Sequence, residues 1–177
     1  KKKLTKKEVL FLILSSLLTT ILLAYDNVYR PDAGLYHLPY TGIINENKII
    51  IGLSNIHFRF GHISIMQYLS GLNYNYLFNS YGILIPLSGI SSFFILFFLN
   101  SVLKIFKKKE INLGNLFALY IIIYISYKIN RYSGFGNDAV AHLCFFLIIY
   151  IFLNLKKNNL WLLSLLCVFA FTNKTTL

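Results

Sequence analysis

Charged residues are scarce in this 177-residue sequence, and acidic residues are scarcest of all. Only 13% of the residues are charged, 56% are apolar, and six Asp and Glu stand against 17 Lys and Arg. A soluble domain of this length could not hide so much apolar surface from water. Only two cysteines occur, Cys144 and Cys167, and both fall inside apolar runs, where a disulfide is not expected. The sequence also lacks internal repeats, low-complexity linkers and a nucleotide-binding glycine loop.

The apolar residues form five blocks, which predict membrane-spanning helices. Helices are expected because each segment must satisfy its own backbone polar groups inside a bilayer. The predicted fold class is therefore all-α, a single polytopic membrane domain over residues 1–177. The first block, led by KKKLTKK, resembles a signal peptide, but no small-residue cleavage pattern follows it. Because the chain begins at Lys and stops just beyond the last block, we expect an N-terminal fragment. The predicted spans are 9–25, 77–99, 111–129, 139–155 and 160–171.

Basic residues set the expected orientation of these spans, because Lys and Arg accumulate in cytoplasmic loops. Eleven of the 17 fall on one side, which places the N-terminus in the cytoplasm. The net charge of +11 is then explained by basic residues that set the topology and that are attracted to anionic lipid headgroups. A nucleic-acid partner is not expected, since no soluble basic face is present. The eleven are Lys1, Lys2, Lys3, Lys6, Lys7, Lys104, Lys107, Lys108, Lys109, Lys156 and Lys157.

The external loop, about residues 26–76, is too long for a simple connector, and loops of this length tend to be functional. Its apolar residues recur at roughly helical spacing around Tyr36 to Ile44 and around Ile63 to Leu69. This spacing predicts short helices that lie in the outer membrane interface. The loop tyrosines are typical of the aromatic belt found at headgroup depth.

Most of the acids fall on the external side, so a site is expected to face outward. These are Asp26, Asp32, Glu46 and Asp138, with His142 one helical turn after Asp138. An ionisable group just inside the membrane boundary is costly and usually functional. Asp32 and Asp138 also stand where each could cap a helix, and the sequence leaves the cap and the active-site acid open for both.

Three stretches resemble motifs of bacterial GT-C glycosyltransferases, the polytopic enzymes that use polyprenyl-phosphate sugars. Asp32–Pro39 (DAGLYHLP) resembles their Asp-x-x-x-Tyr-His-Leu-Pro signature in the first external loop. Asn137–Ala141 (NDAVA) is similar to their Asn-Asp motif at the start of a later span. Phe171–Thr175 (FTNKT) resembles their Thr-Lys segment, with Asn173 interrupting the pair. Gly52–Gly61 also resembles a loop of an uncharacterised subgroup of that superfamily.

Sugar transfer from a lipid phosphate requires a base for the acceptor hydroxyl and cations for the departing phosphate. One carboxylate suffices for an inverting displacement, because attack comes from the face opposite the phosphate. The resemblance implies Asp32, rather than Asp26, as the catalytic acid. The expected partners are a lipid-linked sugar donor and membrane lipids, with the oligomeric state left open. No cofactor or metal is expected, although a divalent cation stays open. The predicted substrate-binding residues are Arg30, His37, Arg59, Arg131, Asn137, Asp138, His142 and Lys174.

Two other functions stay open. A transporter or lipid flippase would place ionisable groups near the bilayer midplane on broken helices, whereas these acids lie at the outer boundary. A non-catalytic membrane assembly protein would explain the spans but not the gathered acids and bases.

Overall fold

The computed structural model describes residues 6–25, 30–47, 50–61, 64–74, 77, 79–154 and 160–174. Within these ranges every regular element is helical, which confirms the all-α prediction. The remaining residues, which include Asp26, Lys48 and His62, lie outside the described parts of the chain.

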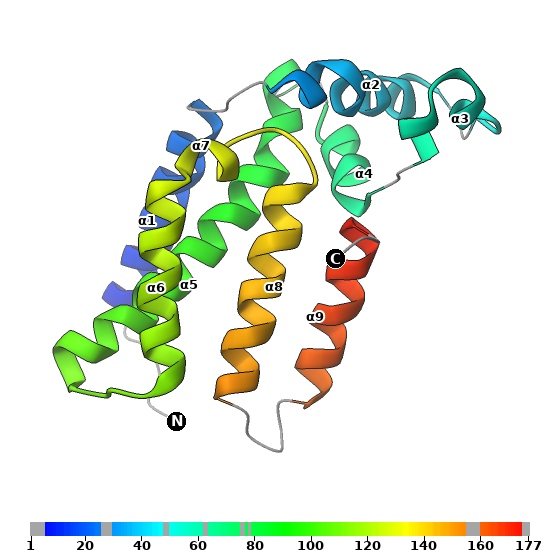
Figure 1. The fold of residues 1–177 in the computed structure, drawn as a ribbon. Helices are drawn as coiled ribbons and strands as arrows, with labels where there is room; N and C mark the ends of the chain where they lie inside the picture. The colour runs from blue at the N-terminus through cyan, green and yellow to red at the C-terminus, as the bar shows by residue number, and fades with distance from the viewer. Residues whose placement is uncertain are drawn as a thin grey trace.

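The described residues include five long helices, which lie side by side and alternate in direction along the chain (Figure 1). Helix α5 packs against α1, α6 and α8, while α9 packs against α8. The interior between them contains Phe98, Ile121 and Leu143, each almost fully buried. The long helices are α1 (Lys6–Tyr25), α5 (Ile85–Lys108), α6 (Leu113–Tyr127), α8 (Asp138–Leu153) and α9 (Leu160–Asn173).

Hydroxyl and amide groups join several of these helices in the interior. The Ser101 hydroxyl donates to the Tyr150 hydroxyl over 3.0 Å, and Tyr150 lies 3.4 Å from Asn115 Oδ1. These bonds connect α5, α8 and α6. The Ser92 hydroxyl similarly donates to the Ser16 carbonyl on α1 over 3.3 Å. Buried polar groups are costly when unpaired, so these contacts fix how the helices face one another.

Short helices gather at the end of the bundle where α1 ends and α8 begins (Figure 1). Most of them belong to the segment that joins α1 to α5. Helix α4 contacts α2, α5 and α9, so this segment is packed onto the bundle. The short elements are the π-helical turn η1 (Ala33–His37), α2 (Leu38–Glu46), α3 (Leu53–Ile56), the 3₁₀ turns η2 (Phe58–Gly61) and η3 (Asn79–Leu84), α4 (Ile65–Leu72) and α7 (Ile129–Tyr132).

Among the described residues, one continuous helical stretch, Tyr81–Lys107, is long and apolar enough to cross a membrane by length and composition. Four further apolar helices are shorter, between 10 and 17 residues, and belong to α1, α6, α8 and α9. Helix α5 continues beyond residue 99, the predicted end of the second span, because Val102 and Ser101 still face the interior. The helical path after α6 is interrupted at Lys128, so residue 129 begins the separate helix α7.

Candidate functional site

A cavity of about 70 Å³ lies at the end of the bundle where the short helices gather. The start of the segment that joins α1 to α5, helix α7 and the connection from α7 into α8 contribute its walls. Six of the nine sequence-predicted site residues line it, although they come from two stretches about 100 residues apart. The lining residues are Arg30, Asp32, Tyr36, His37, Arg131, Gly134, Phe135, Gly136, Asn137, Asp138 and Ala139.

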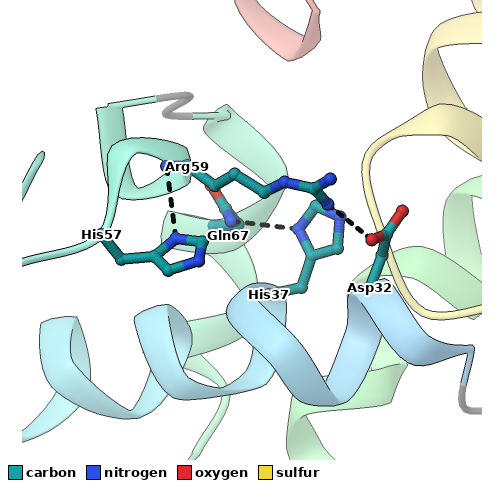
Figure 2. A network of polar contacts seen from close by, with 5 residues as sticks. All are labelled: Asp32, His37, His57, Arg59 and Gln67. Atoms are coloured by element: carbon teal, nitrogen blue, oxygen red, sulfur yellow. Dashed lines mark hydrogen bonds and ion pairs between the residues drawn. The ribbon is translucent and has the colours of Figure 1, made fainter.

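Asp32 pairs with Arg59, a seventh predicted site residue. Arg59 Nη1 donates to Asp32 Oδ1 over 2.5 Å, and the guanidinium lies 4.9 Å from the centre of the Tyr36 ring. Figure 2 shows the Arg59 side chain reaching across His37 to Asp32. The Asp32 side chain is 59% exposed, so a solvent-borne group can reach its carboxylate. Asp32 occupies the N-cap position of η1, but its side chain forms no cap hydrogen bond. The carboxylate instead pairs with Arg59.

His37 lies one π-helical turn after Asp32 and is buried. Its Nδ1 is 3.2 Å from Gln67 Nε2 on α4, as the dashed line in Figure 2 marks. Burial lowers the pKa of His37 to about 4, and this effect outweighs the nearby carboxylates of Asp138 and Asp32, which raise it. The imidazole is therefore neutral near pH 7.

Asp138 pairs with Lys174, which brings the eighth predicted residue to the same place. Lys174 Nζ donates to Asp138 Oδ1 over 2.6 Å, so the end of α9 meets the start of α8. Asp138 is the first residue of α8, and the N-cap position belongs to Asn137, which makes no side-chain cap bond. The cap interpretation of Asp138 therefore misplaced the N-cap by one residue.

His142, the last of the predicted residues, lies one turn further along α8 and is half-buried. Its ring contacts the Tyr132 ring edge-on, with centroids 6.4 Å apart. It therefore stands behind Asp138, on the protein-facing side of α8. The structure brings all nine predicted residues to one region, whereas Asp26 lies outside the described residues.

Two glycines allow the cavity walls to approach closely. A Cβ at Gly134 would stand 3.2 Å from Arg30 Nε, and a Cβ at Gly136 would stand 3.2 Å from His37 Nε2. Gly136 also has a φ of +157°, which side-chain-bearing residues rarely adopt. Gly134 and Gly136 were not predicted as site residues, although the run Gly134-Phe135-Gly136 directly before the Asn-Asp motif was a usable signal.

A larger cavity of about 230 Å³ lies further along α2. Its described lining is mostly apolar and aromatic, and it contains no charged side chain. Of these two cavities, only the smaller one is lined by charged side chains that could exchange a proton or bind an anion. The lining residues of the larger cavity are Tyr40, Ile43, Ile44, Asn47, Ile50, Gly52, Leu53, Ser54, Phe60, Gly61 and Tyr68.

No group of three or more His, Cys, Asp and Glu side chains gathers for a metal ion among the described residues. Each of the two cavity carboxylates instead bonds to a cationic side chain. The described site is thus arranged around paired side-chain charges.

The family described as a domain of unknown function (DUF8201) matches residues 1–177, the whole of the chain. No curated protein and no solved structure matches it.

Proposed function

We propose a function for this chain, which belongs to the family described as a domain of unknown function (DUF8201), from the chemistry of its cavity. The protein is a polytopic membrane glycosyltransferase. The enzyme transfers a sugar from a polyprenyl phosphate to an acceptor hydroxyl on the outer face of a bacterial inner membrane.

The membrane setting is supported by apolar side chains that face outward from the bundle. Phe11, Phe93, Trp161 and Phe171 are each between 58% and 70% exposed, and they belong to three different long helices. Monomeric soluble proteins rarely expose apolar surface on this scale. Lipid tails would cover these side chains, and the charged cavity would then stand at one membrane surface, where water and lipid headgroups meet.

Asp32 is suited to act as the general base. Its carboxylate lies at the cavity and is accessible, and it would take the proton of the acceptor hydroxyl. The hydroxyl oxygen then bonds to the anomeric carbon, and the bond from that carbon to the phosphate oxygen breaks. The bonding electron pair leaves with the polyprenyl phosphate, and the configuration at the anomeric carbon inverts.

Arg30 and Arg131 are suited to bind the phosphate. Both are exposed and line the cavity, and neither forms an ion pair with a described residue. Guanidinium groups bind phosphate through paired, charge-assisted hydrogen bonds. Arg59 and Lys174, by contrast, bind the two carboxylates and hold them at the rim.

One observation carries this proposal: an accessible carboxylate, Asp32, and two arginines without described acidic partners line the same cavity. A transporter would gain little from this arrangement at the end of a helical bundle, since its site belongs near the middle of the membrane.

The test compares Asp32→Asn with Glu46→Gln in the protein expressed from its complete gene. Glu46 ends α2 and is exposed, and it does not line the cavity, so it is a matched acid-to-amide control. Membrane vesicles receive radiolabelled polyprenyl-phosphate sugars, one donor at a time, with a cell-envelope extract as acceptor. We expect Asp32→Asn to insert normally and to lose transfer by about a hundredfold or more, with Glu46→Gln unaffected.

Retained transfer in Asp32→Asn would remove Asp32 as the base. Movement of labelled donor across the bilayer, with no transfer to the extract, would favour the flippase instead.

A further inference from the structure

Gln67 and His37 meet in the interior between α4 and the π-helical turn. Gln67 Nε2 lies 3.2 Å from His37 Nδ1, and the two residues are only 3% and 6% exposed. Water cannot easily replace either partner at this depth, so the contact decides the state of the imidazole.

The orientation of the Gln67 amide follows from its other contact. The Ser64 backbone N–H donates to Gln67 Oε1 over 3.0 Å, as part of the capping box that begins α4. A backbone N–H only donates, so the oxygen of the amide must face Ser64 and the NH₂ group must face His37. The NH₂ group also only donates, so Nδ1 of His37 must accept. In a neutral imidazole the proton then resides on Nε2.

A buried network keeps this arrangement in place. The Ser64 hydroxyl accepts from the Met66 backbone N–H over 3.2 Å and donates to Asn173 Oδ1 over 3.3 Å. Ser64 is fully buried and Asn173 is 2% exposed. This bond connects the capping box to Asn173, the last residue of α9. The next residue, Lys174, pairs with Asp138.

The protonated nitrogen of His37 faces the cavity wall at Gly136. A Cβ at that position would stand 3.2 Å from Nε2, so only a glycine leaves this edge of the ring open. His37 and Gly136 line the cavity together with Arg30 and Arg131. The cavity thus combines two cationic groups with one neutral N–H donor.

We propose that Gln67 is a positioning residue that fixes the tautomer of His37, so that the Nε2–H donates a hydrogen bond to a phosphoryl oxygen of a lipid phosphate in the cavity. This inference rests on the proposed function and divides the roles within the site. His37 has no ring nitrogen left to accept a proton from the acceptor, so the base is a carboxylate, the role assigned above to Asp32. A third cation would bind the departing phosphate tightly enough to prevent its release. A neutral donor binds it less strongly, so the phosphate can still leave.

The tautomer is measured directly by ¹⁵N NMR of histidine-labelled protein in nanodiscs, with His37→Asn to identify the signals. We expect the proton on Nε2 in the wild-type protein. In Gln67→Glu the carboxylate still accepts from Ser64 but cannot donate, so the proton should move to Nδ1 and the pKa of His37 should rise. Asn45→Asp, the same chemical change at an exposed position of α2, should alter neither.

The ligand is tested with polyprenyl phosphate alone, incorporated in the same nanodiscs. Its addition should shift the His37 Nε2–H signal in the wild-type protein, and Gln67→Glu should bind it about 10- to 100-fold more weakly through the lost hydrogen bond. A wild-type proton on Nδ1, or an unchanged His37 signal with bound lipid phosphate, would overturn the proposal. Both measurements are independent of turnover, so a failure of the transfer assay remains distinguishable from a failure of this inference.

Discussion

Lys174 Nζ lies 2.6 Å from Asp138 Oδ1, so the residue that follows α9 is tied to the first residue of α8. The two side chains are 35% and 51% exposed, and a pair this accessible contributes little to stability. Its value lies in placing a carboxylate at the rim of the cavity.

The first prediction therefore separates stability from activity at this pair. Lys174→Gln should change the free energy of unfolding by less than about 1 kcal/mol, because water screens the pair. Transfer should fall about tenfold or more, because the Asp138 carboxylate loses its position. Lys107→Gln, an exposed lysine at the other end of the bundle, is the control for lost charge. A strong loss of thermal stability with unchanged transfer would make the pair purely structural.

Gly136→Ala should damage the site through a single methyl group. The added Cβ would stand 3.2 Å from His37 Nε2, and the ring cannot move easily because Gln67 holds its other side. The φ of +157° adds strain, so we expect a loss of stability of about 1–3 kcal/mol. Gly89→Ala is the matched control, since its Cβ would meet nothing within 4 Å on helix α5 and should be neutral or slightly stabilising. Equal effects of the two alanines on unfolding would contradict this account of Gly136.

The third prediction concerns pH. Burial lowers the pKa of His37 from 6.5 to about 4, so the unfolded chain binds a proton between these values and the folded protein does not. Stability should be independent of this group above pH 6.5 and should fall as the pH drops toward 4, by on the order of 3 kcal/mol. The measurement is the free energy of unfolding in nanodiscs between pH 4 and pH 8. His37→Asn should lose this part of the slope, and an unchanged slope would assign it to other groups.

The fourth prediction tests the membrane orientation. In a background with Cys144→Ala and Cys167→Ser, a cysteine at Asn47 should react with a membrane-impermeant thiol reagent in intact cells. A cysteine at Lys107 should react only after permeabilisation, because the clustered basic residues are expected in the cytoplasm. Both positions are exposed in the structure, so accessibility within the protein does not decide the result. The reverse labelling pattern would invert the orientation and place the cavity on the cytoplasmic side.

The helices were predictable because apolar composition alone separates them from the loops. Their ends were less predictable, since Lys104 and Lys107 belong to α5 although the charge pattern placed them in a connection. Long basic side chains extend away from a helix toward water, so they do not mark its last residue.

The members of the candidate site were predictable, but their partners were not. The acids and bases could be grouped because they fall at the same ends of the expected helices. The pairing of Asp32 with Arg59, 27 residues later, depends on how the short helices fold over one another, and no periodic pattern encodes that. Gln67 was missed because it carries no charge and acts through a hydrogen bond to His37. The spacing Ser64-x-x-Gln67 is nevertheless a recognisable capping-box pattern.

The π-helical turn Ala33–His37 determines how Asp32 and His37, which are five residues apart in the sequence, are placed around the helix axis. Its wider turn, in which the Leu38 N–H donates to the Ala33 carbonyl five residues earlier, lets the two side chains emerge on one side of the helix (Figure 2). Ordinary α-helical winding over the same five residues would turn Asp32 about 140° around the axis from His37, away from Arg59. The placement of Asp32 beside His37 therefore depends on the π-helical winding of the DAGLYH segment more than on the side chain at Gly34, where a Cβ would meet nothing within 4 Å.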